Sequence, residues 1–350
     1  MNVQETLHRI RPVSTRWTAK ARQRLDNLTK PRGSLGVLED LAARYVAIRE
    51  EMPPKVPQKE IFVFAGDHDV VSEGVSAYPQ EVTGLMVRNF LGGGAAVNVL
   101  SRCAGAAISV IDIGMKEDLV DAGVLIRRKV RNGAGNIARG PAMSREQAEA
   151  AVGVGIEMAE KARANGATMI GTGEMGIGNT TPSAAILASL LPAEAREVTG
   201  RGTGVDDRAL EGKIRTVERA LSLHREALGD PLSVLACLGG LEIAGICGLC
   251  LGGAARRMAV VVDGFISGAG ALVAMRLNPL VGDYLFFSHR STEKGHGKFF
   301  EREGIRPILD LDLRLGEGTG GAIAMQVIDD AIRIFNEMAT FSDAGIEPGA

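Results

Sequence analysis

Short apolar runs alternate with amphipathic segments along this chain, and this alternation limits the folds that it can adopt. The runs with the length and composition of strands are 61–65, 107–113, 124–130, 167–171, 258–263, 284–287 and 308–313. Helical periodicity lies between several of them, for example where Ser144 opens a capping box and Gly166 ends the segment. Strands that alternate with helices pair in parallel, so we expect an α/β fold with a mainly parallel, Rossmann-like sheet and helices on both faces.

The two ends of the chain differ from its middle. The first 57 residues contain no clear strand, and a helical pattern follows Gly321. We therefore expect a large α/β domain over residues 58–322 and a small helical domain built from residues 1–57 and 323–350.

Composition excludes several classes of protein. The net charge is −2 and no long run has one sign, so a nucleic-acid groove or a membrane surface is not expected. The N-terminus lacks a signal-like apolar core, which favours a cytoplasmic protein. The CxxC of Cys247 and Cys250 lies in apolar surroundings with no second ligand pair, so we expect buried thiols and no metal site.

A carboxylate flanked by glycines, Glu317, follows the last apolar run and precedes a helical pattern. Glycine on both sides allows a sharp turn and the close approach of a ligand. A carboxylate in that position suits a general base, whereas for a lone glutamate a solvated loop is the alternative.

The segment 171–181 has the features of an anion site, because its glycines follow a strand and precede a helix. Gly171, Gly173 and Gly176 match the GxGxxG pattern of dinucleotide-binding folds, but no suitable acidic residue follows a second strand. A structural glycine-rich turn is the alternative. A second turn at 200–204, the cation Lys213 and the polar segment 288–297 offer further donors, although Lys213 alone is typical of a solvated helix face.

Taken together, the motifs resemble the nicotinate-nucleotide–dimethylbenzimidazole phosphoribosyltransferases. The resemblance covers about residues 30–325, and its motifs come in the same order as in that family. They are 30–36 (KPRGSLG), 66–68 (GDH), 76–83 (SAYPQEVT), 92–98 (GGGAAVN), 173–181 (GEMGIGNTT), 288–291 (SHRS) and 316–320 (GEGTG).

The resemblance implies a reaction, a set of site residues and an assembly. Members transfer the phosphoribosyl group of nicotinate mononucleotide to 5,6-dimethylbenzimidazole with inversion at C1′, for the lower ligand of cobalamin. It implies no cofactor and no metal, and a homodimer whose subunits combine a parallel α/β domain with a small helical domain. Glu317 is then the general base, and Ser72, Gln80 and Leu315 contact the azole. The nucleotide-binding positions are Glu174, Gly176, Ile177, Gly178, Asn179, Thr180, Gly202, Lys213, Asp263, Gly264 and Ser291.

Two other classes of function remain as alternatives. A nicotinamide-dependent oxidoreductase would use the GxGxxG match, and a non-catalytic nucleotide-binding protein would keep the glycine loops without needing Glu317. The preferred azole and the role of Asp67 and His68 stay open, since a pair at a strand end can serve catalysis or simply hydrogen-bond its turn.

Overall fold

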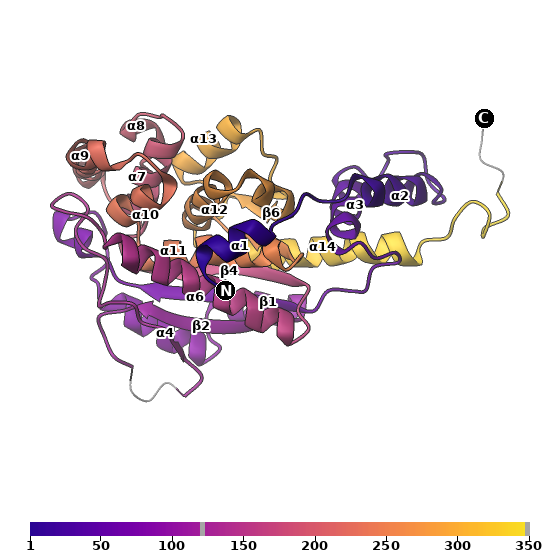
Figure 1. Cartoon of the computed structure of the whole chain (residues 1–350), viewed down its shortest axis with the longest axis horizontal. Coiled ribbons are helices and arrows are strands. Elements are labelled where there is room, and N and C mark those ends of the chain that lie inside the picture. Colours follow the sequence, from indigo (N-terminus) through magenta and orange to yellow (C-terminus); the bar gives the residue numbers. More distant parts are fainter. Residues whose placement is uncertain (120–122, 347–350) are drawn as a thin grey trace.

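A six-stranded parallel sheet forms the centre of the protein (Figure 1). The computed structural model describes residues 1–119 and 123–346. The strand order is β3-β2-β1-β4-β5-β6, and each neighbouring pair is parallel. The strands are β1 (Lys59–Gly66), β2 (Ala106–Gly114), β3 (Ile126–Arg127), β4 (Met169–Met175), β5 (Ala259–Val262) and β6 (Leu285–Phe287). The predicted parallel α/β fold is confirmed.

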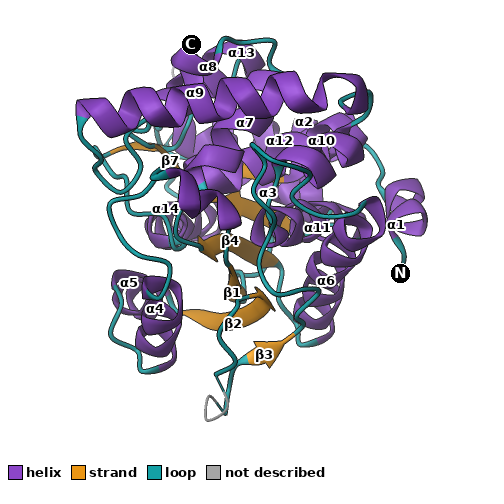
Figure 2. Cartoon of the chain, turned by 90° about the vertical axis from the view of Figure 1, so that its left-hand side faces the viewer, coloured by secondary structure: helices purple, strands orange, loops and turns teal. Residues whose placement is uncertain are grey.

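Helices cover both faces of this sheet (Figure 2). One face packs against α11 and α12, with α6 behind α11, and the other packs against α4, α5 and α14. The α-helices are α1 (Val3–Arg9), α2 (Thr15–Asp26), α3 (Val37–Arg49), α4 (Val82–Leu91), α5 (Ala96–Ala104), α6 (Arg145–Ala164), α7 (Thr180–Leu190), α8 (Ala195–Val198), α9 (Asp207–His224), α10 (Pro231–Leu238), α11 (Leu241–Ala255), α12 (Phe265–Leu277), α13 (Lys294–Glu303) and α14 (Thr319–Glu337). The 3-10 helices are η1 (Asp69–Glu73), η2 (Arg225–Ala227) and η3 (Pro279–Tyr284).

Glycines bring α6 and α11 unusually close together. A Cβ atom on Gly155 would lie 1.9 Å from the Gly245 carbonyl oxygen, and one on Gly248 would lie 1.9 Å from the Val152 carbonyl oxygen. The α11 helix is therefore enclosed between α6 and the sheet, and its Cys247 and Cys250 are fully buried, as predicted. No helix among the described residues is long and apolar enough to cross a lipid bilayer.

Strand β4 continues beyond its predicted end. We expected a strand that stops at Gly171 and a loop from there on, but β4 extends to Met175. Gly171 and Gly173 pack closely inside the sheet, where a Cβ atom would lie 2.7 Å from Met325 Cε and 2.6 Å from the Glu317 carbonyl oxygen, respectively. Two of the three glycines in the GxGxxG match thus belong to a strand, which removes the basis for a dinucleotide-binding turn.

Two other predicted strands are shorter than expected. Of the run 124–130, Ile126 and Arg127 form the short strand β3, which pairs with β2. The run 308–313 gives a two-residue strand, β8 (Leu309–Asp310), which pairs with β7 (His289–Arg290) and not with the main sheet. This small second sheet lies before the segment that carries Glu317.

The long helix α14 connects the sheet to a group of N-terminal helices (Figure 1). Its first turns pack against β4 and β5, while its last turn receives the guanidinium of Arg24 from α2 on the carbonyl oxygens of Phe335 and Asn336. Helices α2 and α3 lie beside its C-terminal half, whereas α1 packs against α6 and α11. The division into domains 58–322 and 1–57 with 323–350 stays a prediction, and residues 347–350 lie outside the described part of the chain.

Candidate active site

Strands β2 and β3 are added on one side of β1, whereas β4, β5 and β6 are added on the other side. The strand order therefore reverses between β1 and β4, and the carboxyl ends of these two strands form a topological switch point. In open parallel sheets, ligands bind in the crevice outside such a point. Asp67 and His68 follow β1 there, and Glu174 is the last residue but one of β4. The strand order therefore predicts a ligand site in the region where several of the predicted site residues lie.

Glu317 is held at this edge by the turn that begins α14. Its φ of 66° is in the left-handed region, and it is only 6% exposed, so it is not a solvated loop residue. Asp263, after β5, accepts the N–H groups of Gly318 at 3.1 Å and Gly321 at 2.8 Å. Asp263 thus fixes the backbone on which Glu317 stands, and both of its carboxylate oxygens are engaged in doing so.

A second buried carboxylate, Glu174, lies against Glu317. Its Oε1 accepts the Glu317 N–H at 3.3 Å, and its Oε2 accepts Nδ2 of Asn179 at 2.5 Å. Burial, with a smaller contribution from the charge of Asp263, raises the pKa of Glu174 to about 8, although the hydrogen bonds from Asn179 and the Glu317 N–H oppose this shift. Burial, followed by the charge of Asp263, raises the pKa of Glu317 to about 7. A carboxylate with a pKa near neutrality is suited to accept and release protons.

The raised pKa of Glu174 predicts a dependence of stability on pH. An acid that binds its proton more tightly when folded loses folding stability as pH rises from its usual pKa of 4.5 to about 8. We expect Glu174→Gln to remove this loss, which is at most about 5 kcal/mol at 1.36 kcal/mol per pKa unit. Denaturant unfolding at pH 5 and pH 8.5 tests this, with exposed Glu301→Gln as control. Parallel losses in the wild type and in Glu174→Gln would contradict it.

Lys213 on α9 is buried, contrary to the expectation of a solvated helix face. It is 1% exposed, and its Nζ donates to Oγ1 of Thr180 at 2.6 Å. Burial lowers its pKa to about 8, although the charge of Glu293 opposes that shift. A buried ammonium is unfavourable unless it is paired, so this position favours an anionic ligand.

The Gly200–Gly204 turn lies directly against Lys213. A Cβ atom on Gly202 would lie 2.6 Å from Thr180 Oγ1 and 2.9 Å from Lys213 Nζ. The Gly202 φ of 54° also requires glycine, and its N–H donates to Glu293 Oε1 at 2.8 Å. The structure thus brings Gly202, Thr180 and Lys213 together.

The segment from Gly176 to Thr180 leads from β4 into α7. Gly176 faces the protein interior, because a Cβ atom there would lie 2.4 Å from the Gly66 carbonyl oxygen and 3.2 Å from His68 Nε2. The Ile177 N–H donates to Thr83 Oγ1 at 3.2 Å, and the φ of Gly178 is 92°. The first N–H groups of α7 follow, which is the arrangement that binds anions at helix N-termini.

The predicted azole residues are more exposed than Glu317. Ser72, on η1, is exposed and donates to the Asp69 carbonyl oxygen at 2.7 Å. Gln80 donates from Nε2 to the His68 carbonyl oxygen at 3.0 Å. Leu315 is 55% exposed two residues before Glu317, so its side chain is available to a ligand.

Ser291 and Gly264 border a buried cluster of rings instead of an open polar turn. The Ser291 N–H donates to Nδ1 of His296 at 3.0 Å, and His296 is fully buried beside Phe300. A Cβ atom on Gly264 would lie 3.4 Å from His289 Cε1. The segment 288–297 was predicted to present donors and cations, but both of its histidines support the site from inside.

Some residues that support the site are not found by motif analysis. Glu293 anchors Gly202, and His68 pairs with Glu242 at 2.7 Å with both side chains almost completely buried. Glu293 lies within a segment that the sequence singled out, but its carboxylate gave no separate signal. Glu242 lies in an apolar stretch, where a single acidic residue could have been taken as a sign of a buried partner. Among the described residues, no group of three or more His, Cys, Asp or Glu is placed to hold a metal ion.

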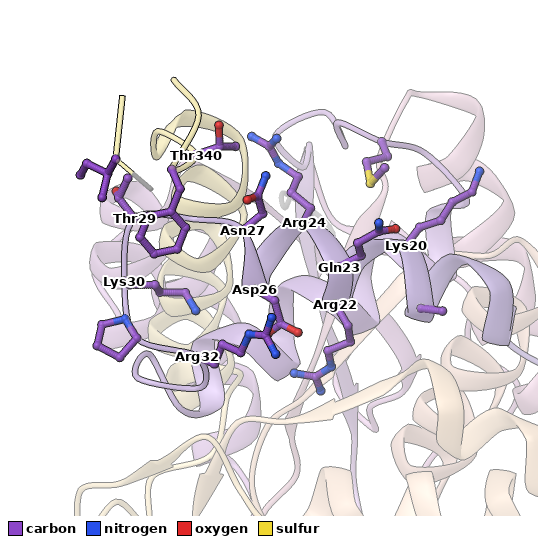
Figure 3. Close-up of a pocket in the computed structure, with 15 residues that line it drawn as sticks. Lys20, Arg22, Gln23, Arg24, Asp26, Asn27, Thr29, Lys30, Arg32 and Thr340 are labelled. Atoms are coloured by element: carbon purple, nitrogen blue, oxygen red, sulfur yellow. The ribbon is translucent and has the colours of Figure 1, made fainter. Parts of the chain in front are cut away.

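A cavity of about 1540 Å³ lies elsewhere, between α2 and the C-terminal segment (Figure 3). It is lined by several cations, and three of them already have partners. Arg22 pairs with Asp40, the Lys30 Nζ lies 2.7 Å from Glu39, and Arg24 donates to carbonyl oxygens at the end of α14. The cavity shares no residue with the set around Glu317, so its size alone does not make it the site.

Comparison with known proteins shows the family of this chain. The model of a family described as phosphoribosyltransferase matches residues 10–346. A Geobacter sulfurreducens protein named nicotinate-nucleotide–dimethylbenzimidazole phosphoribosyltransferase is 56% identical over 99% of this chain and 98% of its own. One of the same name from Chlorobaculum tepidum is 53% identical over 98% and 97%. A crystal structure of CobT from Thermus thermophilus has a TM-score of 0.92 and 47% identity, covering 95% of this chain and 100% of that one. The chain therefore belongs to the phosphoribosyltransferase family.

Proposed function

We propose that this protein transfers the phosphoribosyl group of nicotinate mononucleotide to 5,6-dimethylbenzimidazole, giving α-ribazole 5′-phosphate and nicotinate for the lower ligand of cobalamin. The names of the relatives support these substrates. One observation on the structure carries the proposal. A chain of contacts runs from Glu317 through Glu174 and Asn179 to the adjacent Thr180 and on to Lys213. It places a carboxylate with a pKa of about 7 and a buried cation on one continuous framework.

The proposed chemistry needs a base and accurate placement of two substrates. One ring nitrogen of the azole attacks C1′ of the ribose, while Glu317 takes the proton from the other nitrogen. The C1′–nitrogen bond to the pyridinium breaks, and its electron pair neutralises the ring, which leaves as nicotinate. Attack on the face opposite the leaving group inverts C1′ from β to α. Holding both rings in line across C1′ is mainly an effect of positioning.

The nucleotide phosphate would bind the buried ammonium of Lys213 and the N–H groups of the segment from Gly176 to Thr180. Charge-assisted hydrogen bonds of this kind are among the strongest available to a protein. Gly202, Gly264 and Ser291 would border the nucleotide. Glu174 and Asp263 are engaged with the backbone or side chains around Glu317, so the proposal gives them the task of supporting the base.

The azole would lie between Ser72, Gln80 and Leu315, on the exposed side of Glu317. An exposed leucine and two uncharged polar groups suit a flat, weakly polar ring. The proposal also includes a homodimer and a cytoplasmic location. Light scattering of the purified protein tests the first, and fractionation of cells tests the second.

An assay of product formation tests the proposed reaction. Purified protein is incubated with nicotinate mononucleotide, with and without 5,6-dimethylbenzimidazole, and the products are separated by liquid chromatography. We expect nicotinate release that depends on the azole, together with an equal amount of α-ribazole 5′-phosphate. Absence of release with every azole tested, from protein that still binds the mononucleotide, would favour a non-catalytic binding protein.

A further inference from the structure

Two segments far apart in the sequence face the two proposed substrates. The azole segment, residues 69–80, carries Ser72 and Gln80, and the nucleotide segment, residues 200–219, carries Lys213. Within the azole segment only Val70 and Val75 are buried, so few apolar contacts hold it in place. A segment with so little buried surface is held only weakly in one conformation.

Glu73 ties the azole segment to the nucleotide segment. Its Oε2 accepts a hydrogen bond from Arg219 on α9, six residues after Lys213. Its Oε1 accepts Nδ2 of Asn136 at 2.8 Å and Nε of Arg139 at 2.8 Å. The Glu73 side chain is 11% exposed, whereas those of Arg219 and Arg139 are 53% and 70% exposed, so the carboxylate is shielded but its two cations reach solvent.

A second tie joins the same two segments about four residues further along the azole segment. Oγ1 of Thr203 accepts the Ala77 N–H at 2.9 Å and lies 3.3 Å from Oγ of Ser76. The neighbouring Gly202 is itself anchored to Glu293. The turn that borders Lys213 therefore also holds the stretch that leads to Gln80.

Glu73 is ionised, and Asn136 links its carboxylate to the hydroxyl of Ser72. Nδ2 of Asn136 donates to Ser72 Oγ at 3.2 Å as well as to Glu73. Burial would raise the pKa of Glu73, but hydrogen bonds from Asn136, Arg219 and Arg139 lower it below its usual value of 4.5. The carboxylate thus carries its charge at neutral pH, and its partners fix the segment on which Ser72 stands.

We propose that Glu73 is a positioning residue that couples azole binding to nucleotide binding, so that each substrate raises the affinity for the other. This inference rests on the proposed function. A nucleotide that orders residues 200–219 also orders the azole segment through Glu73 and Thr203. The azole then binds a segment whose ordering has already occurred, and reciprocity requires the same effect in the other direction.

Initial rates over a grid of nicotinate mononucleotide and 5,6-dimethylbenzimidazole concentrations measure this coupling. In the wild type, we expect the azole KM to fall about fivefold or more between limiting and saturating nucleotide. In Glu73→Gln this ratio should approach one, with kcat at saturation of both substrates within about threefold of wild type. A role in folding alone would lower kcat or the melting temperature and leave the ratio unchanged.

Three further variants supply a second test of the coupling and two controls. Glu157→Gln removes a carboxylate that also pairs with two cations, Arg128 and Lys161, but lies on α6 away from both segments. It should keep the wild-type ratio. Thr203→Val removes the second tie and should lower the ratio, whereas Thr203→Ser keeps the hydroxyl and should restore it.

The outcomes separate this inference from the proposed function. An active wild type whose ratio persists in Glu73→Gln, or whose azole KM is the same at all nucleotide concentrations, overturns the coupling and leaves the reaction intact. A wild type without azole-dependent nicotinate release overturns the proposed function, and the coupling falls with it.

Discussion

Replacing Glu317 by glutamine is expected to reduce turnover by about 100-fold or more, the usual scale for a positioned base. The amide cannot accept the azole proton at neutral pH. The shape of the side chain is kept, and the turn is held by Asp263 through the backbone, not through the Glu317 carboxylate. Binding of nicotinate mononucleotide, measured by calorimetry, should therefore stay close to that of the wild type.

The same assignment fixes the direction of the pH profile. The pKa of Glu317 is raised to about 7, and a base works only when it is deprotonated. We expect kcat/KM of the wild type to rise with pH below about 7 and to level off above it, and the remaining activity of Glu317→Gln to lack this rise. Glu337→Gln, at the other end of α14, serves as control. Turnover near that of the wild type in Glu317→Gln would remove Glu317 from the role of base.

Features set by neighbours in the sequence were predictable. Ser144 caps α6 with the expected capping box. The alternation of runs predicted the parallel sheet, because each βα unit buries its own apolar face. The end of β4 was not predictable, because in the sequence Gly171 and Gly173 look like turn residues. Only the structure shows that Met325 and the Glu317 carbonyl oxygen pack where their side chains would be.

Pairs formed across the fold explain most of the site that the sequence alone did not show. His68 and Glu242 are 174 positions apart, and their 2.7 Å contact depends on how α11 packs beneath β1. Asp67 likewise accepts the Lys116 N–H, so both members of the Asp-His pair, whose role stays open, contact residues far away in the sequence. Only the family resemblance predicted that Glu317, Glu174 and Lys213 belong to one site.

The helical period of α9 contains a signal for the burial of Lys213. Within α9, Lys213 shares a face with Val217 and Ala220, which are four and seven positions further on and are both buried. A lysine on the apolar face of an amphipathic helix is either unfavourable or functional. The charge of Lys213 favours solvent exposure, whereas its position on the apolar face of α9 predicts burial. In the structure Lys213 is buried.

Replacing Lys213 by methionine should therefore weaken nucleotide binding without weakening the fold. A hydrogen bond to a charged group contributes about 1.5–3 kcal/mol, so we expect the Kd for nicotinate mononucleotide to rise by roughly 10- to 100-fold. The folded-state pKa of about 8 lies below the usual 10.5, which means that the buried ammonium reduces stability at neutral pH. The ligand-free variant should thus be at least as stable as the wild type at pH 7.

Calorimetry and denaturant unfolding on the same preparation test both parts of this expectation. Lys161→Met, which removes an exposed ammonium from α6, controls for the loss of one positive charge. Opposite effects on binding and on stability are the result expected of a residue kept for a ligand. An unchanged Kd in a stable Lys213→Met protein would instead show that the buried cation does not bind the phosphate, and the anion site would have to be placed at the N-terminus of α7 alone.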